Sequence, residues 1–211
     1  MPGSSDKGTI WNSHYCWTIP HRATLCIEQT TRPLPVEETM ATKHLVRGIL
    51  AGVAGGLAAS WVMNEFSSTL GQKLSAAVET PEEQQELRQQ SDGEDATMKA
   101  ADKIVETVTG GRHLSHEQRE IGGPIVHYSM GAISGGIYGA LAEYTDVAKA
   151  GFGTTFGGIL FATADVLGVP AMHLGRWPDE YPVSSLASPL AAHLVYGATT
   201  ELVRRIVRKV L

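Results

Sequence analysis

The sequence has few of the features that mark an enzyme or a nucleic-acid-binding protein. Its 211 residues include two cysteines, Cys16 and Cys26, which allow at most one disulfide bond and do not have the spacing of a zinc site. Lys and Arg number 17 against 22 Asp and Glu, so no basic surface predicts nucleic-acid binding. Phosphate-binding, nucleophile-elbow and His-Glu-x-x-His motifs are absent. We therefore expect no catalytic residue, no cofactor and no nucleic-acid partner.

The first 39 residues also lack a continuous apolar stretch that could serve as a signal peptide. They show neither helical nor strand periodicity, which predicts a disordered leader over 1–39. We interpret Met40 as the biological start, with the leader an over-extended reading frame. A disordered cytoplasmic tail is the alternative.

Charged residues are nearly missing from four long segments of the chain. These are 48–64, 121–142, 150–172 and 183–200, and together they contain one acidic residue, Asp165. A helix needs roughly 20 mostly apolar residues to cross a bilayer. The sequence therefore predicts an all-α fold, a polytopic four-transmembrane-helix bundle in residues 40–211. The spans lie at about 45–66, 121–142, 150–172 and 183–203, and the lipid bilayer is the main partner.

Basic residues flank this bundle at both ends of the chain. Two precede the first span and four follow the last: Lys43, Arg47, Arg204, Arg205, Arg208 and Lys209. The positive-inside rule then places both termini in the cytoplasm and the loop 67–120 outside an inner (plasma) membrane. Residues 66–120 contain 6 basic and 11 acidic residues, which agrees with an outer location.

Parts of this acidic outer loop have helical patterns. Thr80-Pro81-Glu82-Glu83 has the form of a helix start, and 95–109 has helical spacing that ends at Gly110. We expect one or two short helices at the outer surface; a solvated acidic linker is the alternative.

Glycines recur at every fourth residue within the predicted spans. The set is Gly48, Gly52, Gly56, Gly131, Gly135, Gly139, Gly153 and Gly157. Such stripes let helix backbones approach closely, so they predict Gly-rich helix interfaces within the bundle or between copies in a homo-oligomer. A second interpretation is that the glycines bend a gate or line a pore.

Three ionisable residues share helix faces with these glycines: His127, Asp165 and His193. We expect them to form a buried polar layer at one depth, with Glu65 and His173 at its outer rim. Such a layer could bond the helices together, pass a proton or hold a transition metal. No confident metal site follows from this pattern alone.

The last predicted span ends in charged residues. Glu201 precedes Arg205 by four positions, the favourable order for a helical ion pair. We interpret Glu201, Arg204 and Arg205 as an inner anchor, with Arg204 and Arg208 meeting anionic headgroups.

The stretch Ala192-His193-Leu194-Val195-Tyr196, continued by Thr200-Glu201-Leu202-Val203-Arg204-Arg205, resembles the final span of the YagU-type bacterial inner-membrane proteins, a domain family of unknown function. His127 and Glu143 stand sixteen residues apart, as do a His and a Glu of that family. Asp165 and Pro170 are similar to a His followed five residues later by Pro, with Asp in place of His. The likeness covers about 47–64 and 121–205, and it implies a small integral inner-membrane protein.

Three functions remain open from the sequence. The first is a structural or stress-related membrane component, in which the polar layer holds helices together. The second is a proton, ion or metal conduit that uses the His127, Asp165 and His193 layer. The third, a membrane-embedded enzyme, needs a nucleophile, for which the sequence offers no candidate.

Overall fold

The computed structural model describes residues 15–17, 25–27, 36–90 and 93–211, and the chain divides into two units, 1–40 and 41–211. In the first unit, β1 (Tyr15–Trp17) pairs antiparallel with β2 (Leu25–Ile27), and Cys16 lies opposite Cys26. Aromatic and branched residues favour such pairing, although no strand pattern was expected here. The rest of the predicted leader lies outside the described residues.

From Val36 onward every described element is helical, which confirms the all-α prediction. The elements are α1 (Val36–Phe66), the π-helix η1 (Ser67–Gly71), α2 (Gln72–Val78), α3 (Pro81–Gln90), α4 (Ala96–Thr109), α5 (His116–Tyr144), the 3-10 helix η2 (Asp146–Gly153), α6 (Thr154–Leu160), the π-helix η3 (Phe161–Gly168), α7 (Val169–Ala171), the 3-10 helices η4 (Pro178–Glu180) and η5 (Val183–Leu186), and α8 (Ala187–Val210).

Two helical stretches of the described chain are long and apolar enough to cross a membrane, judged by length and composition. They are His44–Val78, with 35 residues, and Asp146–Ala171, with 26 residues. α5 (29 residues) and α8 (24 residues) are also long, but they are not among these two. Their histidines, tyrosines and charged residues lower their mean hydropathy.

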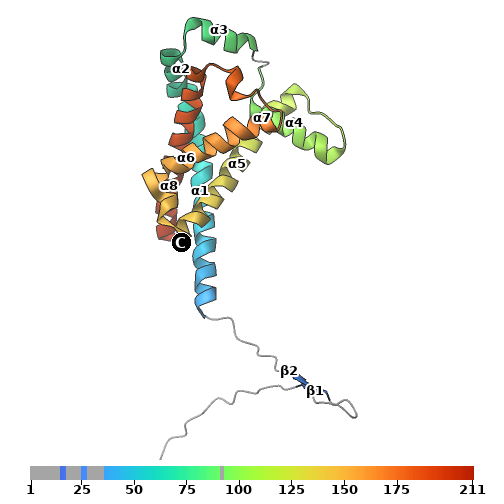
Figure 1. The fold of residues 1–211 in the computed structure, drawn as a ribbon, viewed down its shortest axis with the longest axis vertical. Helices are drawn as coiled ribbons and strands as arrows, with labels where there is room; N and C mark the ends of the chain where they lie inside the picture. The colour runs from blue at the N-terminus through green and yellow to red at the C-terminus, as the bar shows by residue number, and fades with distance from the viewer. Residues whose placement is uncertain (1–14, 18–24, 28–35, 91–92) are drawn as a thin grey trace, which may run out of the picture. The chain divides into compact units, whose positions relative to one another are not determined.

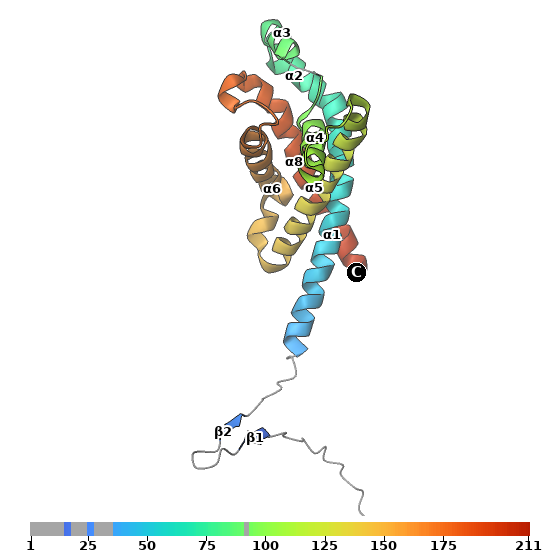
Figure 2. The same cartoon turned by 90° about the vertical axis from the view of Figure 1, so that its right-hand side faces the viewer.

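α1, α5, α6 and α8 form the body of the second unit (Figures 1 and 2). α2 and α3 lie at one end, and the C-terminus lies at the other. We call the end with α2, α3 and residues 172–186 the loop side, and the end with residues 145–153 and the C-terminus the terminal side. α1 and α6 run toward the loop side, while α5 and α8 run toward the terminal side.

Two element boundaries differ from the predicted spans. Residues 150–153 reverse the chain, because Gly151, Phe152 and Gly153 all have positive φ angles, so the third α-helix begins at Thr154 and not at residue 150. Residues 183–186 form a 3-10 turn, and α8 begins at Ala187.

Two helices contain π-helical stretches. In η1, Ser68 and Thr69 donate side-chain hydrogen bonds to the Glu65 carbonyl at 3.1 and 2.6 Å. η3 precedes Pro170, which has no N–H group and crowds the preceding turn. The π-helix η3 contains Asp165, so the 3.6-residue period used to place Asp165 on a glycine face does not apply there.

The acidic segment contains the helices that the sequence predicted. Thr80 and Glu83 form reciprocal hydrogen bonds of 2.7 and 3.2 Å at the start of α3. Asp95 accepts a hydrogen bond of 2.8 Å from the Met98 N–H at the start of α4, and Gly110 ends α4 with φ of 73°. The prediction of a partly helical loop is confirmed, and the alternative of a featureless linker is not.

Candidate functional site: a polar bundle interior with two charged ends

The glycines of α1 lie directly against the glycines of α5. A Cβ atom at Gly52 would overlap the Gly135 carbonyl oxygen and lie 2.8 Å from the Gly139 Cα atom. Gly48 faces Gly139 and Glu143, and Gly56 faces Gly131 and Gly135 in the same manner. No side chain larger than hydrogen fits between the two backbones at these positions.

A second close contact joins α6 to α8. A Cβ atom at Gly153 would overlap the Gly197 carbonyl oxygen, and one at Gly157 would overlap the His193 carbonyl oxygen. α8 also lies close to α1. A Cβ atom added at Gly55 of α1 would lie 2.7 Å from the Thr200 carbonyl oxygen. Each of the eight glycines predicted to mediate helix packing thus lies close to another helix of the same chain.

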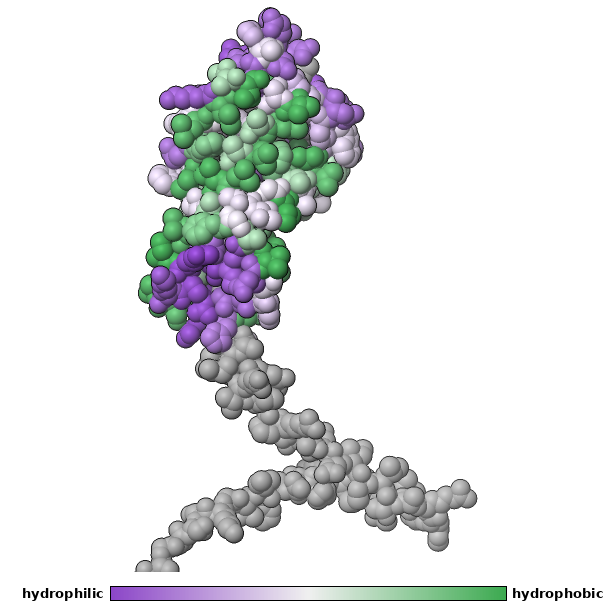
Figure 3. Space-filling model, turned by 60° about the vertical axis from the view of Figure 1, so that its left-hand side comes forward, coloured by the Kyte–Doolittle hydropathy of each residue, from purple (hydrophilic) through white to green (hydrophobic). Residues whose placement is uncertain are grey.

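Polar side chains lie inside this bundle, while large apolar side chains lie outside. Ser60, Thr200 and Glu201 are fully buried. Five large apolar residues drawn from all four helices are more than half exposed: Trp61, Ile125, Ile133, Ile159 and Ile206. Figure 3 shows on one face a broad apolar band that is bounded by polar surface at both ends. Apolar residues such as Phe161 and Leu174 are buried as well, so the unusual feature is the extent of the exposed apolar surface.

The terminal side holds a buried charged cluster centred on Glu201. The Glu201 carboxylate accepts hydrogen bonds from Tyr138 Oη (2.8 Å), Arg204 Nε (2.7 Å) and Arg205 Nε (2.6 Å). Arg205 also lies over the Phe152 ring, with 4.7 Å from its Cζ to the ring centroid. Both oxygens of Glu201 are therefore bound to donors.

A second carboxylate extends this cluster. Glu143 accepts two hydrogen bonds from Arg208, at 2.9 and 3.2 Å, and lies 3.8 Å from Arg204 Nη1. Arg208 also contacts His44 Nδ1 of α1 at 2.9 Å. We expected Arg204 to reach lipid headgroups; it is instead buried, because its guanidinium lies between two carboxylates.

Toward the loop side, the structure brings two of the three predicted ionisable residues together. Asp165 Oδ2 lies 3.7 Å from His193 Nδ1. The same Nδ1 lies 2.9 Å from the Pro189 carbonyl oxygen, and since a carbonyl can only accept, Nδ1 carries the ring hydrogen. The His193 side chain is 9% exposed and that of Asp165 is 40% exposed.

His127 has a different immediate partner. Its Nε2 lies 3.5 Å from the Ser60 carbonyl oxygen, although His127 is close enough to act electrostatically on Asp165. The Ser60 hydroxyl is fully buried and has no hydrogen-bond partner among the described residues. Glu65 and His173, predicted at the outer rim, are both exposed, and His173 ends α7 with φ of 58°.

Within the described residues, no group of three or more His, Cys, Asp or Glu side chains is arranged to hold a metal ion. His127, Asp165 and His193 do not form a common ligand set. The arrangement can share protons between a carboxylate and an imidazole, and it gives no support to the metal interpretation of the layer.

Three aromatic rings pack together in the bundle. The Phe156 ring lies between those of Tyr138 and Tyr196, with centroid distances of 4.6 and 6.3 Å. Tyr196 Oη donates to the Gly131 carbonyl at 2.7 Å and lies 3.0 Å from Ser134 Oγ. Sequence reasoning missed both tyrosines, yet Tyr138 stands seven residues after Gly131, a spacing that places it on the glycine face of α5.

Outside the bundle, α4 packs on the first turns of α5, with Met98 and Ala101 against Gly123 and Gly122. Ionic contacts surround this seam. Glu94 lies 3.0 Å from His116 and 2.9 Å from Arg119, and these contacts lower the pKa of Glu94 below its ordinary range.

The pKa values of two other groups at this seam, His116 and Asp102, are shifted as well. The hydrogen bond to Glu94 raises the pKa of His116. Hydrogen bonds from His113 and from the Leu114 N–H lower the pKa of Asp102. The pKa values of three groups at this seam are therefore shifted by their contacts in the folded protein.

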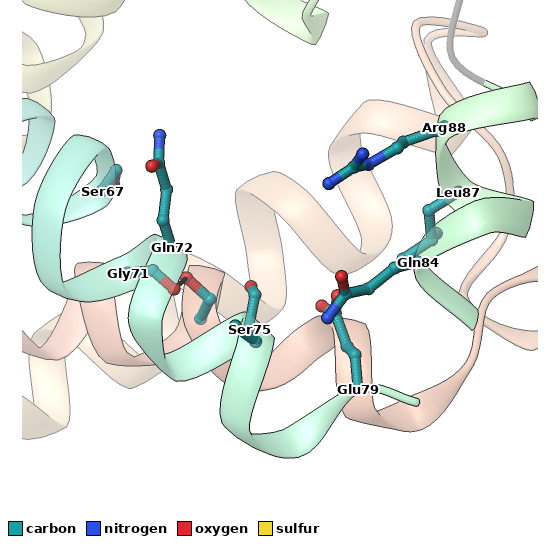
Figure 4. A pocket seen from close by; sticks show the side chains of 10 residues that line it. Ser67, Gly71, Gln72, Ser75, Glu79, Gln84, Leu87 and Arg88 are labelled. Carbon is teal, nitrogen blue, oxygen red and sulfur yellow. Dashed lines mark hydrogen bonds between the residues drawn. The ribbon is translucent and has the colours of Figure 1, made fainter. Parts of the chain in front are cut away.

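An open pocket of about 570 Å³ lies beside α2, α3 and the start of α8 (Figure 4). Its lining is mostly polar and includes Gln72, Glu79, Gln84 and Arg88. Ser188 Oγ closes one edge by donating to the Gly71 carbonyl at 3.1 Å. The pocket contains none of the residues predicted from the sequence.

Comparison with protein-family models, with curated protein sequences and with solved structures finds no match to this chain. The resemblance to the YagU-type proteins therefore stays a prediction.

Proposed function

We propose that the protein is a multi-pass integral membrane protein of a bacterial inner membrane, and that its role is structural. α1, α5, the helix over 154–171 and α8 all cross the bilayer, with both termini in the cytoplasm. The observation that carries the proposal is the exposed apolar surface on all four helices, which includes several isoleucines, around an interior that buries Ser60, Thr200 and Glu201. In a bilayer, helices associate through close backbone contacts at small residues, and they keep polar groups inside and apolar side chains toward lipid.

This placement also accounts for α5 and α8. In α8, the residues that lower the mean hydropathy are buried: His193, Tyr196, Glu201 and Arg204. Ile206 of α8 and Ile133 and Ile137 of α5 are exposed. A helix of this kind satisfies its polar groups by internal partners and still presents an apolar surface to lipid. We also propose, on the motif likeness, a relationship to the YagU-type family and no enzymatic activity.

Vesicle flotation and alkaline extraction test the membrane assignment. The full-length chain, expressed in a bacterial host, is expected to float with vesicles and to stay in the pellet after carbonate treatment at high pH. Recovery of a folded, monodisperse chain in the supernatant without detergent would contradict it.

Cysteine labelling then tests the crossing by α5. In a background with Cys16→Ser and Cys26→Ser, Glu82→Cys is expected to react with an impermeant maleimide from outside, and Asp146→Cys only after the membrane is opened. Reaction of both positions from the same side would contradict an odd number of crossings between them.

A further inference from the structure

Asp165 is the one acidic residue of the four apolar segments, and its surroundings differ from those of the buried carboxylate Glu201. It lies in the π-helix η3, its side chain is partly exposed, and the charged groups acting on it are two histidines, His193 of α8 and His127 of α5. From α1, the Ser60 carbonyl oxygen lies 3.5 Å from Nε2 of His127, one of these two histidines. π-helical insertions often occur at functional sites.

The tautomer of His193 determines where a proton can bind. Because Nδ1–H points to the Pro189 carbonyl and to Asp165, the lone pair of the neutral ring is on Nε2. A proton from water that binds to Nε2 converts the ring to imidazolium, and the Asp165 carboxylate balances the new positive charge. Release of the same proton to water reverses the step. The net charge of the pair thus changes from −1 to 0.

Aromatic side chains lie between this pair and Glu201. Along α8, Tyr196 stands between His193 and Glu201, and its ring lies 6.3 Å from that of Phe156, which lies 4.6 Å from that of Tyr138. The Tyr196 hydroxyl is directed to Gly131 and Ser134, and the Tyr138 hydroxyl to Glu201. The two hydroxyls therefore belong to separate hydrogen-bond groups, with the Phe156 ring between the two tyrosine rings.

We propose that Asp165 and His193 form a proton-binding site that exchanges with water on the loop side and is closed to the terminal side by Phe156. This inference rests on the proposed membrane-spanning function. If the chain fails to float with vesicles, both the membrane assignment and the proton site are contradicted. If it floats but fails the two tests below, only the proton site is contradicted.

The first test is NMR spectroscopy of histidine-labelled protein in lipid bilayers, with His193→Gln used to assign the ring. We expect the chemical shifts of the His193 ring to change with pH, because the proposed site binds a proton. Asp165→Asn should alter this change, whereas the matched control Asp146→Asn, on the terminal side, should leave it as it is. A His193 ring whose signals do not change with pH, or change in the same way in the Asp165→Asn protein, would overturn the site.

The second test measures proton entry into vesicles that contain a pH-sensitive dye, driven by a potassium diffusion potential. The wild-type protein should conduct poorly, and Phe156→Ala should raise the rate at least tenfold. The double variant with Asp165→Asn should return to the wild-type rate, while the double variant with Asp146→Asn should stay high. Phe156→Leu, which keeps an apolar side chain, should conduct like the wild type.

A Phe156→Ala protein that keeps its helix content and its elution volume but shows no added conduction would overturn the closure by Phe156. Conduction that persists after Asp165→Asn would show that protons bypass the pair, which would also contradict the proposal.

Discussion

Two carboxylates, Glu201 of α8 and Asp165 of η3, which faces His193 of α8, have different environments. Glu201 is fully buried, and it accepts hydrogen bonds from a tyrosine and two arginines on α5 and α8. Asp165 is partly exposed and faces the single hydrogen-bearing nitrogen of His193. A buried carboxylate with every oxygen bound holds the fold together, whereas an incompletely paired one near an imidazole can exchange protons.

The difference assigns separate roles to the two sides of the bundle. On the terminal side, three arginines and two glutamates from two helices bind one another. On the loop side, histidines pair with carboxylates, both in the bundle and between α4 and α5. Arginine keeps its charge at all accessible pH values and histidine does not. The terminal side should therefore carry stability, and the loop side should carry pH response.

The largest effect is expected from Glu201→Ala. Removing this carboxylate leaves Arg204 buried without its main partner, so the unfolding free energy should fall by about 3–5 kcal/mol. Reversible unfolding in mixed micelles measures the change. The control Glu106→Ala, which removes an exposed pairing with Lys103, should cost less than about 0.5 kcal/mol. A loss below about 1 kcal/mol for Glu201→Ala would contradict the claim that the terminal side carries the stability of the bundle.

Gly52→Ala should cost about 1–3 kcal/mol, because the added methyl group must push α1 away from the Gly135 backbone. Gly158→Ala is the matched control, since its Cβ would meet only Leu194 Cδ2 at 3.8 Å. There the methyl group fits, and the higher helix propensity of alanine should leave stability unchanged or raise it by up to about 1 kcal/mol. The same unfolding assay compares them, and equal losses would show that the helix seam is not tight.

Asp165→Asn should change the unfolding free energy by less than about 1 kcal/mol, since the 3.7 Å from its carboxylate to His193 is too long for a hydrogen bond and asparagine keeps the shape of the side chain. A loss as large as that of Glu201→Ala would mean that both carboxylates serve to hold helices together, and the comparison would fail.

The contact between α4 and α5 should be most stable between about pH 4.5 and 6.5. The pKa values of Glu94 and Asp102 are lowered by folding, so their contribution is present above the unfolded values and is lost as pH falls through the folded ones. The pKa of His116 is raised, so its contribution is present below its unfolded value and is lost as pH rises through the folded one.

Methyl NMR of Met98, which is buried in this seam, reports the change. His116→Gln should abolish the weakening at higher pH and leave the acidic side of the profile intact. If the Met98 signal does not change with pH in either protein, the claim that the loop side responds to pH is contradicted.

The helical fold could be predicted because its signals are local. Glycine spacing, the helical spacing of 95–109 and the Gly110 stop each depend on neighbouring residues, and α4 (Ala96–Thr109) lies within the predicted bounds. The start of the third helix could not be predicted, because it depends on three consecutive residues with positive φ, one of them Phe152. The pairing of Glu201 with Arg205 followed from i to i+4 spacing.

The partners that lie far apart in sequence were not predictable. Tyr138 and Glu201 are 63 residues apart, and Glu143 and Arg208 are 65 apart, so only the packing of α5 on α8 brings them together. Asp165 was assigned to a layer by a helical period that η3 does not follow, and His127 is oriented by the Ser60 carbonyl of α1.

The central claim is that lipid covers the isoleucine-bearing faces of this bundle. Spin labels at Ile133 and Ile137, both more than half exposed on α5, measure it through their collision rates with oxygen and with a water-soluble nickel complex in reconstituted vesicles. The account predicts frequent collisions with oxygen and rare collisions with nickel at both positions, and the opposite pattern at Glu82 on α3. Frequent nickel collisions at Ile133 and Ile137 would show that water surrounds these faces and would contradict it.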